Sequence, residues 1–146
     1  MPRPIYLIVF NSPLFPAHWG LWIPHPSSSD PQTGTYLNAT GDAASGFSIE
    51  FERNYELGAD GRRHQLISLG DVADEHVVDV TGDGKWSVDQ VARDRLEEVV
   101  LDVKPPGPSL VAADSKTWIR DAVAALVEAK IMDEEALQIV EKAPKN

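Results

Sequence analysis

The order of its segments constrains this chain more than any other feature, because strand-like segments fill the first half and helix-like segments the second. Between residues 47 and 55, the apolar Phe47, Ile49 and Phe51 alternate with polar residues, which is the pattern of a strand with one buried face. Other apolar or aromatic segments predict strands at residues 4–10, 18–23, 34–40, 63–69 and 77–80. We expect the segment 63–69 to pair with 47–55 across the glycine-containing turn at 58–61.

Three helices are predicted in the second half. Ser87 and Gln90 form a capping-box pattern, so we expect a helix over 87–101, ended by the proline-rich run at 105–108. Asp133 is expected to cap a last helix that ends near residue 140. Apolar residues at helical spacing predict a longer helix over about 114–130: Ile119, Ala122, Val123, Leu126 and Val127.

Strands followed by helices indicate an α+β fold, in which an antiparallel sheet packs against the helix over 114–130. The 146 residues are enough for one core, and no internal repeat is visible, so we expect a single domain over 1–146.

The charge and the missing cysteines exclude several classes of function. The net charge of −10 disfavours binding to nucleic acids and anionic membranes, which attract basic surfaces. The absence of cysteine excludes disulfides, thiolate metal sites and thiol catalysis. The apolar run at residues 5–10 is too short for a signal peptide and no run could span a bilayer, so a cytoplasmic protein is expected.

Three polar residues stand in an order that is typical of a nucleophilic site. His18 opens one predicted strand, Asn38 lies on the next, and Ser115 opens the late helix, so they could act as base, orienting residue and nucleophile. Each residue also has a purely structural interpretation, as a core histidine, a strand-end asparagine and a helix-start serine.

These motifs resemble the permuted papain-like group, to which lecithin:retinol acyltransferase and its phospholipase relatives belong. The run His-Trp-Gly-Leu-Trp-Ile at 18–23 is similar to the strand that carries the family's histidine. Asp-Ser-Lys-Thr-Trp at 114–118 is similar to the late Asn-Cys-Glu-His-Phe motif. The resemblance implies that His18 matches the base, Asn38 the third polar residue and Ser115 the cysteine, with Trp118 at the aromatic position.

The chain departs from that family by having serine where the thiol stands. A cysteine beside an imidazole works because its pKa can fall until the thiolate dominates, whereas a serine hydroxyl must lose its proton during attack. The departure favours a retained pocket from which the covalent chemistry has been lost.

The whole chain also resembles a set of small fungal proteins encoded in natural-product gene clusters. They share His-Trp-x-Leu-(aromatic)-x-Pro, here residues 18–24, and Gly-Phe-x-x-Glu-Phe-x-Arg-Asn, here residues 46–54. The resemblance implies cyclase activity for some members, including the norbornene-forming Diels–Alderase type.

An aromatic pocket is the expected place for such chemistry. Trp19, Trp22 and Trp118 would line it together with Arg53, although tryptophans are more often core residues and Arg53 could simply lie on a solvated strand face. The other histidines, including His25, are expected to be exposed.

Neither a metal nor a cofactor is expected. Asp79 to Lys85 imitates the start of a calcium-binding loop, but the twelfth position is Gln90 where a carboxylate ligand is required. The same stretch is explained as a glycine-rich turn.

Three functions therefore remain open. The favoured one is non-covalent cyclisation or isomerisation of an apolar small molecule, which needs orientation and one or two hydrogen bonds. The alternatives are an acyl hydrolase or transferase that uses Ser115, His18 and Asn38, and a non-catalytic binding module or degenerate enzyme.

Overall fold

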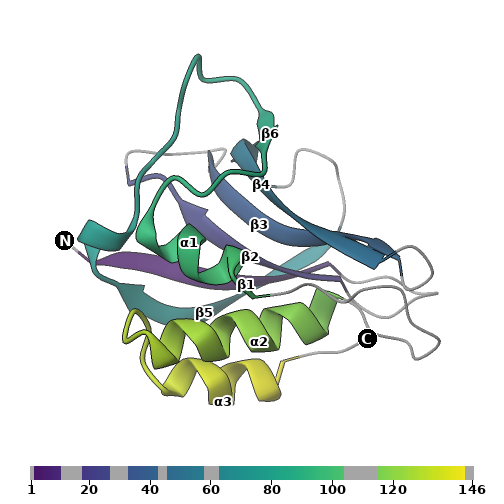
Figure 1. Cartoon of the computed structure of the whole chain (residues 1–146), viewed down its shortest axis with the longest axis vertical. Helices are drawn as coiled ribbons and strands as arrows, with labels where there is room; N and C mark the ends of the chain where they lie inside the picture. Colours follow the sequence, from purple (N-terminus) through teal and green to yellow (C-terminus); the bar gives the residue numbers. More distant parts are fainter. Residues whose placement is uncertain are drawn as a thin grey trace.

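The computed structural model describes residues 2–10, 18–26, 33–42, 46–57, 63–103 and 115–143. These residues form a twisted antiparallel sheet with helices on one side, which confirms the α+β class (Figure 1). The strands are β1 (Arg3–Phe10), β2 (His18–Pro24), β3 (Thr33–Asp42), β4 (Gly46–Glu56), β5 (His64–Val72) and β6 (Ser87–Asp89). The helices are α1 (Arg95–Leu101), α2 (Ser115–Glu128) and α3 (Glu135–Glu141), with a single 3₁₀ turn, η1 (Asp74–His76).

The strand order is β5-β1-β2-β3-β4-β6, and every neighbouring pair is antiparallel. The prediction that residues 63–69 pair with the fourth strand is wrong, because β5 pairs with β1. β1 pairs with β5 along its whole length, from Arg3 opposite Val72 to Phe10 opposite His64, a long-range contact that no local pattern shows.

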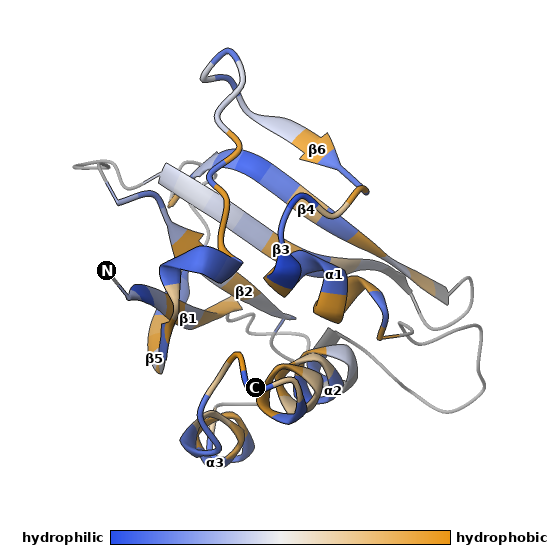
Figure 2. Ribbon diagram, turned by 60° about the vertical axis from the view of Figure 1, so that its left-hand side comes forward, coloured by the Kyte–Doolittle hydropathy of each residue, from blue (hydrophilic) through white to orange (hydrophobic). Residues whose placement is uncertain are grey.

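The alternation of side chains gives the sheet two different faces. One, which we call the helix face, packs against all three helices and forms the larger core, with Leu7, Trp19 and Phe51 from the strands. The other, which we call the aromatic face, has the following buried residues at its centre: Ile8, Phe10, Trp22, Tyr36 and Tyr55. Figure 2 shows the helices gathered on one side of the sheet.

The long helix was predicted correctly. α2 buries Ile119, Val123 and Leu126 completely, and it contacts β2 and β3. α3 follows and contacts β5. The predicted side-chain cap by Asp133 is wrong, because the N-cap of α3 is Glu134. Asp133 instead accepts a hydrogen bond from the amide of Ala136 through its main-chain oxygen. Within the described residues, no helix is long and apolar enough to cross a membrane.

The prediction of a helix from residue 87 is also wrong. Residues 87–89 form the edge strand β6, which pairs with β4, and the helix starts only at Arg95. Asp94 is its N-cap and accepts a hydrogen bond from the amide of Glu97 at 2.7 Å. The effective capping residue therefore lies seven positions beyond Ser87. Residues 77–80, predicted as a strand, pair with none of the described strands.

Candidate functional site

The structure does not bring the three predicted catalytic residues together. His18 lies on the aromatic face, where its ring centroid is 6.4 Å from that of Phe10. Asn38 is 5% exposed and alternates with Leu37, so it shares that face. Ser115 begins α2, which packs on the helix face, and its side chain lies outside the described residues. The sheet therefore stands between α2 and the imidazole that was expected to act as its base.

The tryptophans are likewise divided between the two faces. Trp19 and Trp118 belong to the core beneath the helix face, and the Trp118 indole N–H donates to the Val103 carbonyl at 3.3 Å. Trp22 lies on the aromatic face, three residues after Trp19. One pocket lined by Trp19, Trp22 and Trp118 is therefore replaced by a core and a separate aromatic cluster.

Arg53 neither lines a cavity nor faces solvent. It is 2% exposed on the helix face, where it forms ion pairs with Glu97 of α1 and with Asp89 of β6. Burial disfavours its charge, but the two carboxylates outweigh that effect and raise the pKa of Arg53. The Glu97 carboxylate also accepts from the amide of Arg93 at 2.8 Å. This cluster fastens α1 and β6 to β4, which is a structural role.

The aromatic face is organised by a bulge in β4. Gly34 is opposite Tyr55, and Tyr36 is opposite Glu52, so β4 contains one more residue than β3 between these pairs. Asn54 has a φ of 54°, and the extra residue reverses the alternation after Arg53. Tyr55 consequently joins the aromatic face, with its ring centroid 5.8 Å from that of Trp22 and 5.1 Å from that of Tyr36.

A glycine on β2 brings the Tyr36 ring onto the sheet. A Cβ atom on Gly20 would lie 2.1 Å from Cε1 of Tyr36, so the ring occupies the space above this glycine. The same ring has its centroid 5.7 Å from that of Phe10 in an edge-to-face arrangement. Sequence reasoning missed Tyr36 and Tyr55. Tyr36 could have been identified, because it lies two residues from Asn38 on the same strand and therefore shares its face. Tyr55 could be placed on that face only once the bulge was known.

The buried polar atoms on the aromatic face include Nε1 of Trp22, a donor on a side chain with 0% exposure, and Oδ1 of Asn38, an acceptor. Neither atom has a hydrogen-bond partner among the described residues. Leaving a buried polar group unpaired costs about 1–3 kcal/mol, so such atoms call for a partner. A ligand that carries both an acceptor and a donor would satisfy both atoms.

A second polar cluster lies where β2 ends. Its centre is His25, which was expected to be exposed but is buried at 9% exposure. Its Nδ1 lies 3.0 Å from the Asp79 carboxylate and its Nε2 lies 3.2 Å from Oδ1 of Asn54. Asn54 Nδ2 donates to the carbonyls of Thr81 and Lys85, at 2.8 and 3.0 Å, so Oδ1 must be the acceptor. Both ring nitrogens of His25 therefore face hydrogen-bond acceptors, the Asp79 carboxylate and Oδ1 of Asn54.

Asp79 completes this cluster. It accepts from both terminal nitrogens of Arg3, at 3.0 and 2.8 Å. Burial would raise the pKa of Asp79, but hydrogen bonds from Arg3 and His25 outweigh burial and lower it. Its two oxygens are thus occupied at the first position of the calcium-like segment. The cluster holds the turn at Thr81–Lys85 against Asn54, so we interpret its role as stabilising the fold.

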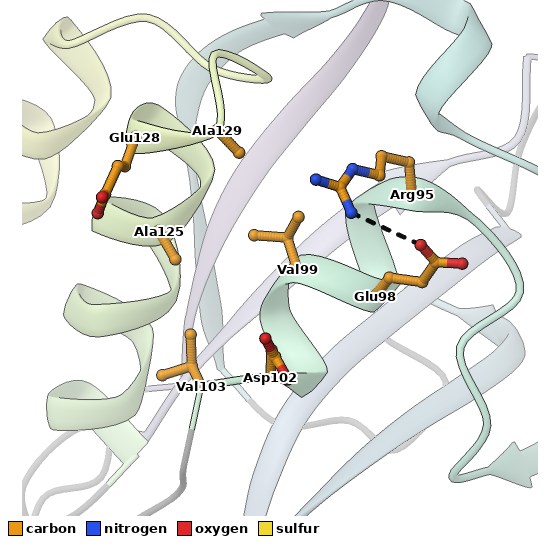
Figure 3. Close-up of a pocket in the computed structure, with 8 residues that line it drawn as sticks. All are labelled: Arg95, Glu98, Val99, Asp102, Val103, Ala125, Glu128 and Ala129. Atoms are coloured by element: carbon orange, nitrogen blue, oxygen red, sulfur yellow. Dashed lines mark ion pairs between the residues drawn. The ribbon is translucent and has the colours of Figure 1, made fainter.

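A shallow groove runs between α1 and α2 (Figure 3). It measures about 390 Å³ and has an apolar floor with mainly acidic sides, on which Arg95 lies 3.7 Å from Glu98. The residues that line it are Arg95, Glu98, Val99, Asp102, Val103, Ala125, Glu128 and Ala129. None of the predicted site residues lines this groove, and it lies on the helix side of the sheet.

Comparison with known proteins places most of the chain in a protein family. A family model described as "Family of unknown function (DUF6540)" matches residues 5–133. No curated protein and no solved structure matches the chain.

Proposed function

This chain belongs to the family of unknown function DUF6540, and we propose that its aromatic face binds an apolar small molecule. The aromatic face would promote the cyclisation or isomerisation of this molecule without a covalent intermediate. The observation that carries the proposal is that two buried polar atoms of the aromatic face, Nε1 of Trp22 and Oδ1 of Asn38, have no hydrogen-bond partner in the part of the chain that the structure describes.

The proposed chemistry requires little more than these groups. A Diels–Alder reaction forms two carbon–carbon σ bonds at the expense of two π bonds, so no group leaves and no side chain has to bond to the substrate. The Trp22 N–H would polarise a substrate carbonyl, and Asn38 would hold a substrate N–H or O–H. The rings of Phe10, Tyr36 and Tyr55 would keep a polyene folded, because orientation supplies a large part of such a rate enhancement.

The hydrolase alternative is less well supported. It needs the Ser115 hydroxyl within about 3 Å of the His18 ring, whereas α2 and that ring lie on opposite faces of the sheet. The permuted papain-like fold and a place in fungal natural-product metabolism rest on resemblance and remain part of the proposal. A binding module would use the same aromatic face without turnover.

The test begins with binding. Decatetraenamide, a conjugated polyene whose amide offers one acceptor and donors, would be titrated by calorimetry. Trp22→Phe removes the N–H and should weaken binding about tenfold, the equivalent of one hydrogen bond of about 1.4 kcal/mol. Trp19→Phe is the matched control, because it makes the same truncation on the same strand but on the helix face, and it should bind normally.

Turnover and labelling then separate the three functions. A linear amide in which a tether joins a diene to an activated alkene should cyclise faster with the protein than without it, and Ser115→Ala should leave that rate unchanged. Binding without acceleration would favour the binding module. A stoichiometric fluorophosphonate adduct on Ser115 that requires His18 would overturn the proposal in favour of the hydrolase.

A further inference from the structure

One edge of the sheet carries no neighbouring strand among the described residues. β5 pairs with β1 on one side, and no described strand lies on its other side. An edge strand turns about half of its main-chain amides and carbonyls outward, where they can pair with a further strand. Gln65 and Ser68 of this strand are exposed. A partner that supplies a strand therefore fits this edge.

β5 has few of the features that protect an edge. Proteins guard an open edge with lysine, proline or a bulge. Residues 64–68 contain neither lysine nor proline. A bulge is present only towards the end of the strand, where Ile5 is opposite Gly70 but Tyr6 is opposite Ser68. The regular part of the edge is thus suited to pairing.

α3 lies at the same end of the sheet as this edge (Figure 2). It contacts β5, whereas α2 contacts β2 and β3, so α3 is the helix beneath the open edge. A shallow groove of about 260 Å³ is lined by residues of α3 and its C-cap alone: Glu135, Gln138, Ile139 and Lys142. The groove therefore lies on a side of α3 that no other described element covers. We call the edge of β5 and this groove together the end surface.

The charges along the groove are self-complementary. Glu135 begins α3 and Lys142 is its C-cap, about two turns later, with the half-buried Ile139 between them. Both charged side chains are exposed. A two-fold axis perpendicular to the sheet sets α3 of a second copy antiparallel to the first, so Glu135 of each copy faces the partner's Lys142. The apolar Ile139 then lies near the axis.

From these two features we propose that the end surface is an interface with a second copy of this chain. The two β5 strands lie antiparallel at the axis and extend the sheet, and the two α3 helices lie side by side beneath them. One axis suits both elements, because it reverses the direction of each and keeps all helices on the same side of the sheet. Such an interface is closed, so it covers the edge of β5 without leading to a fibre. The inference goes beyond the proposed function, whose unpartnered atoms belong to β2 and β3.

The first test measures the mass of the chain in solution by sedimentation velocity, over a dilution series that starts at about 200 μM. The mass should rise with concentration from that of one chain to that of two. Glu135→Lys sets like charges opposite each other and should raise the dissociation constant of the dimer at least about fivefold. General repulsion between copies predicts the reverse, because this change reduces the net charge of −10.

Three further variants identify the contacts. Adding Lys142→Glu to Glu135→Lys restores opposite charges and should return the dissociation constant to within about threefold of the wild type. Glu128→Lys makes the same change of charge on α2, outside the end surface, and should not weaken association. Gln65→Lys places lysines on the open edge and should weaken association while leaving the thermal unfolding of the dilute monomer unchanged.

Cross-linking gives an independent readout, because the chain has no cysteine of its own. Gln138→Cys supplies one thiol near the axis, so a short bis-maleimide should join two copies through it. Ala124→Cys, exposed on α2, is the matched control and should stay largely unlinked. A monomer at every concentration, no recovery in the double variant, an unchanged constant with Gln65→Lys, or equal cross-linking of the two cysteine variants would overturn the inference.

Discussion

Tyr55 packs edge-to-face against Trp22 on the aromatic face, with ring centroids 5.8 Å apart and planes at 71°. In a regular strand, the side chain of Tyr55 would lie on the opposite face of the sheet. Phe51 and Arg53 lie on the helix face, and plain alternation would place Tyr55 beside them. The extra residue in β4, with Asn54 in the left-handed region at a φ of 54°, turns Tyr55 to the other side. The bulge thereby completes the aromatic face.

Substitution of Asn54 should show this dependence. Asn54→Gly keeps the left-handed backbone accessible but removes hydrogen bonds to His25, Thr81 and Lys85, for an expected loss of about 2–3 kcal/mol of unfolding free energy. Asn54→Ala should lose about 1 kcal/mol more, because alanine also bears the left-handed penalty. Urea unfolding measures both. Alanine at least as stable as glycine would contradict the role of the bulge.

The Asp79 carboxylate should stabilise the fold in a pH-dependent way, because it accepts hydrogen bonds from Arg3 and lies 3.0 Å from Nδ1 of His25. Asp79→Asn should release this arrangement and destabilise the fold near pH 6. Because the folded-state pKa of Asp79 is lowered, the contribution of its carboxylate is present above the ordinary value near 4 and is lost as pH falls through the folded pKa. The stability gap between wild type and variant should therefore shrink in acid, and a constant gap would refute the ion pairing.

Asp94 should show the opposite pH dependence. Burial raises the pKa of this N-cap carboxyl from 3.8 to about 6, although it accepts from the amides of Val78 and Glu97. A raised folded-state pKa gives stability that is present below about 4 and lost as pH rises through about 6. Relative to Asp94→Asn, the wild type should lose up to about 3 kcal/mol between these limits. Urea unfolding across this range tests the prediction, and a wild-type advantage that grows with pH would contradict it.

The Arg53–Glu97 pair should be costly to break from one side. Arg53→Met leaves the Glu97 carboxylate buried without its cation and should destabilise the protein by about 3–5 kcal/mol. Arg93→Gln removes the ion pair between the half-exposed Arg93 and Asp89 and should lower the free energy of unfolding by less than about 1 kcal/mol. The double variant Arg53→Met with Glu97→Leu should recover much of the loss. Thermal unfolding compares the three, and a mild Arg53→Met would contradict the buried ion pair.

The sequence predicted local structure well where the pattern of one segment decides it. The first four strands and α2 begin and end within two residues of their expected bounds, because alternation and helical spacing are local properties. The pairing of β5 with β1 depends on a strand nearly sixty residues away. The capping pattern at Ser87 was overridden by pairing with β4 and by the Arg53–Asp89 ion pair. Neither effect is visible within one segment.

The candidate site was predicted less well. His18, Trp22 and Asn38 were identified and share a face, but Trp19 and Trp118 are core residues of the other face. The position of Tyr55 on the aromatic face follows from a one-residue bulge, which alternation alone does not give.

The most direct test of the central claim is the ¹H–¹⁵N spectrum of the four tryptophan indoles during titration with decatetraenamide, with Trp22 assigned from the Trp22→Phe variant. If the aromatic face is the binding site, the Trp22 N–H signal should move downfield as it gains an acceptor, while the signals of Trp19 and Trp118 stay in place. A Trp22 signal that does not move at saturation, or shifts confined to Trp19 and Trp118, would contradict the claim.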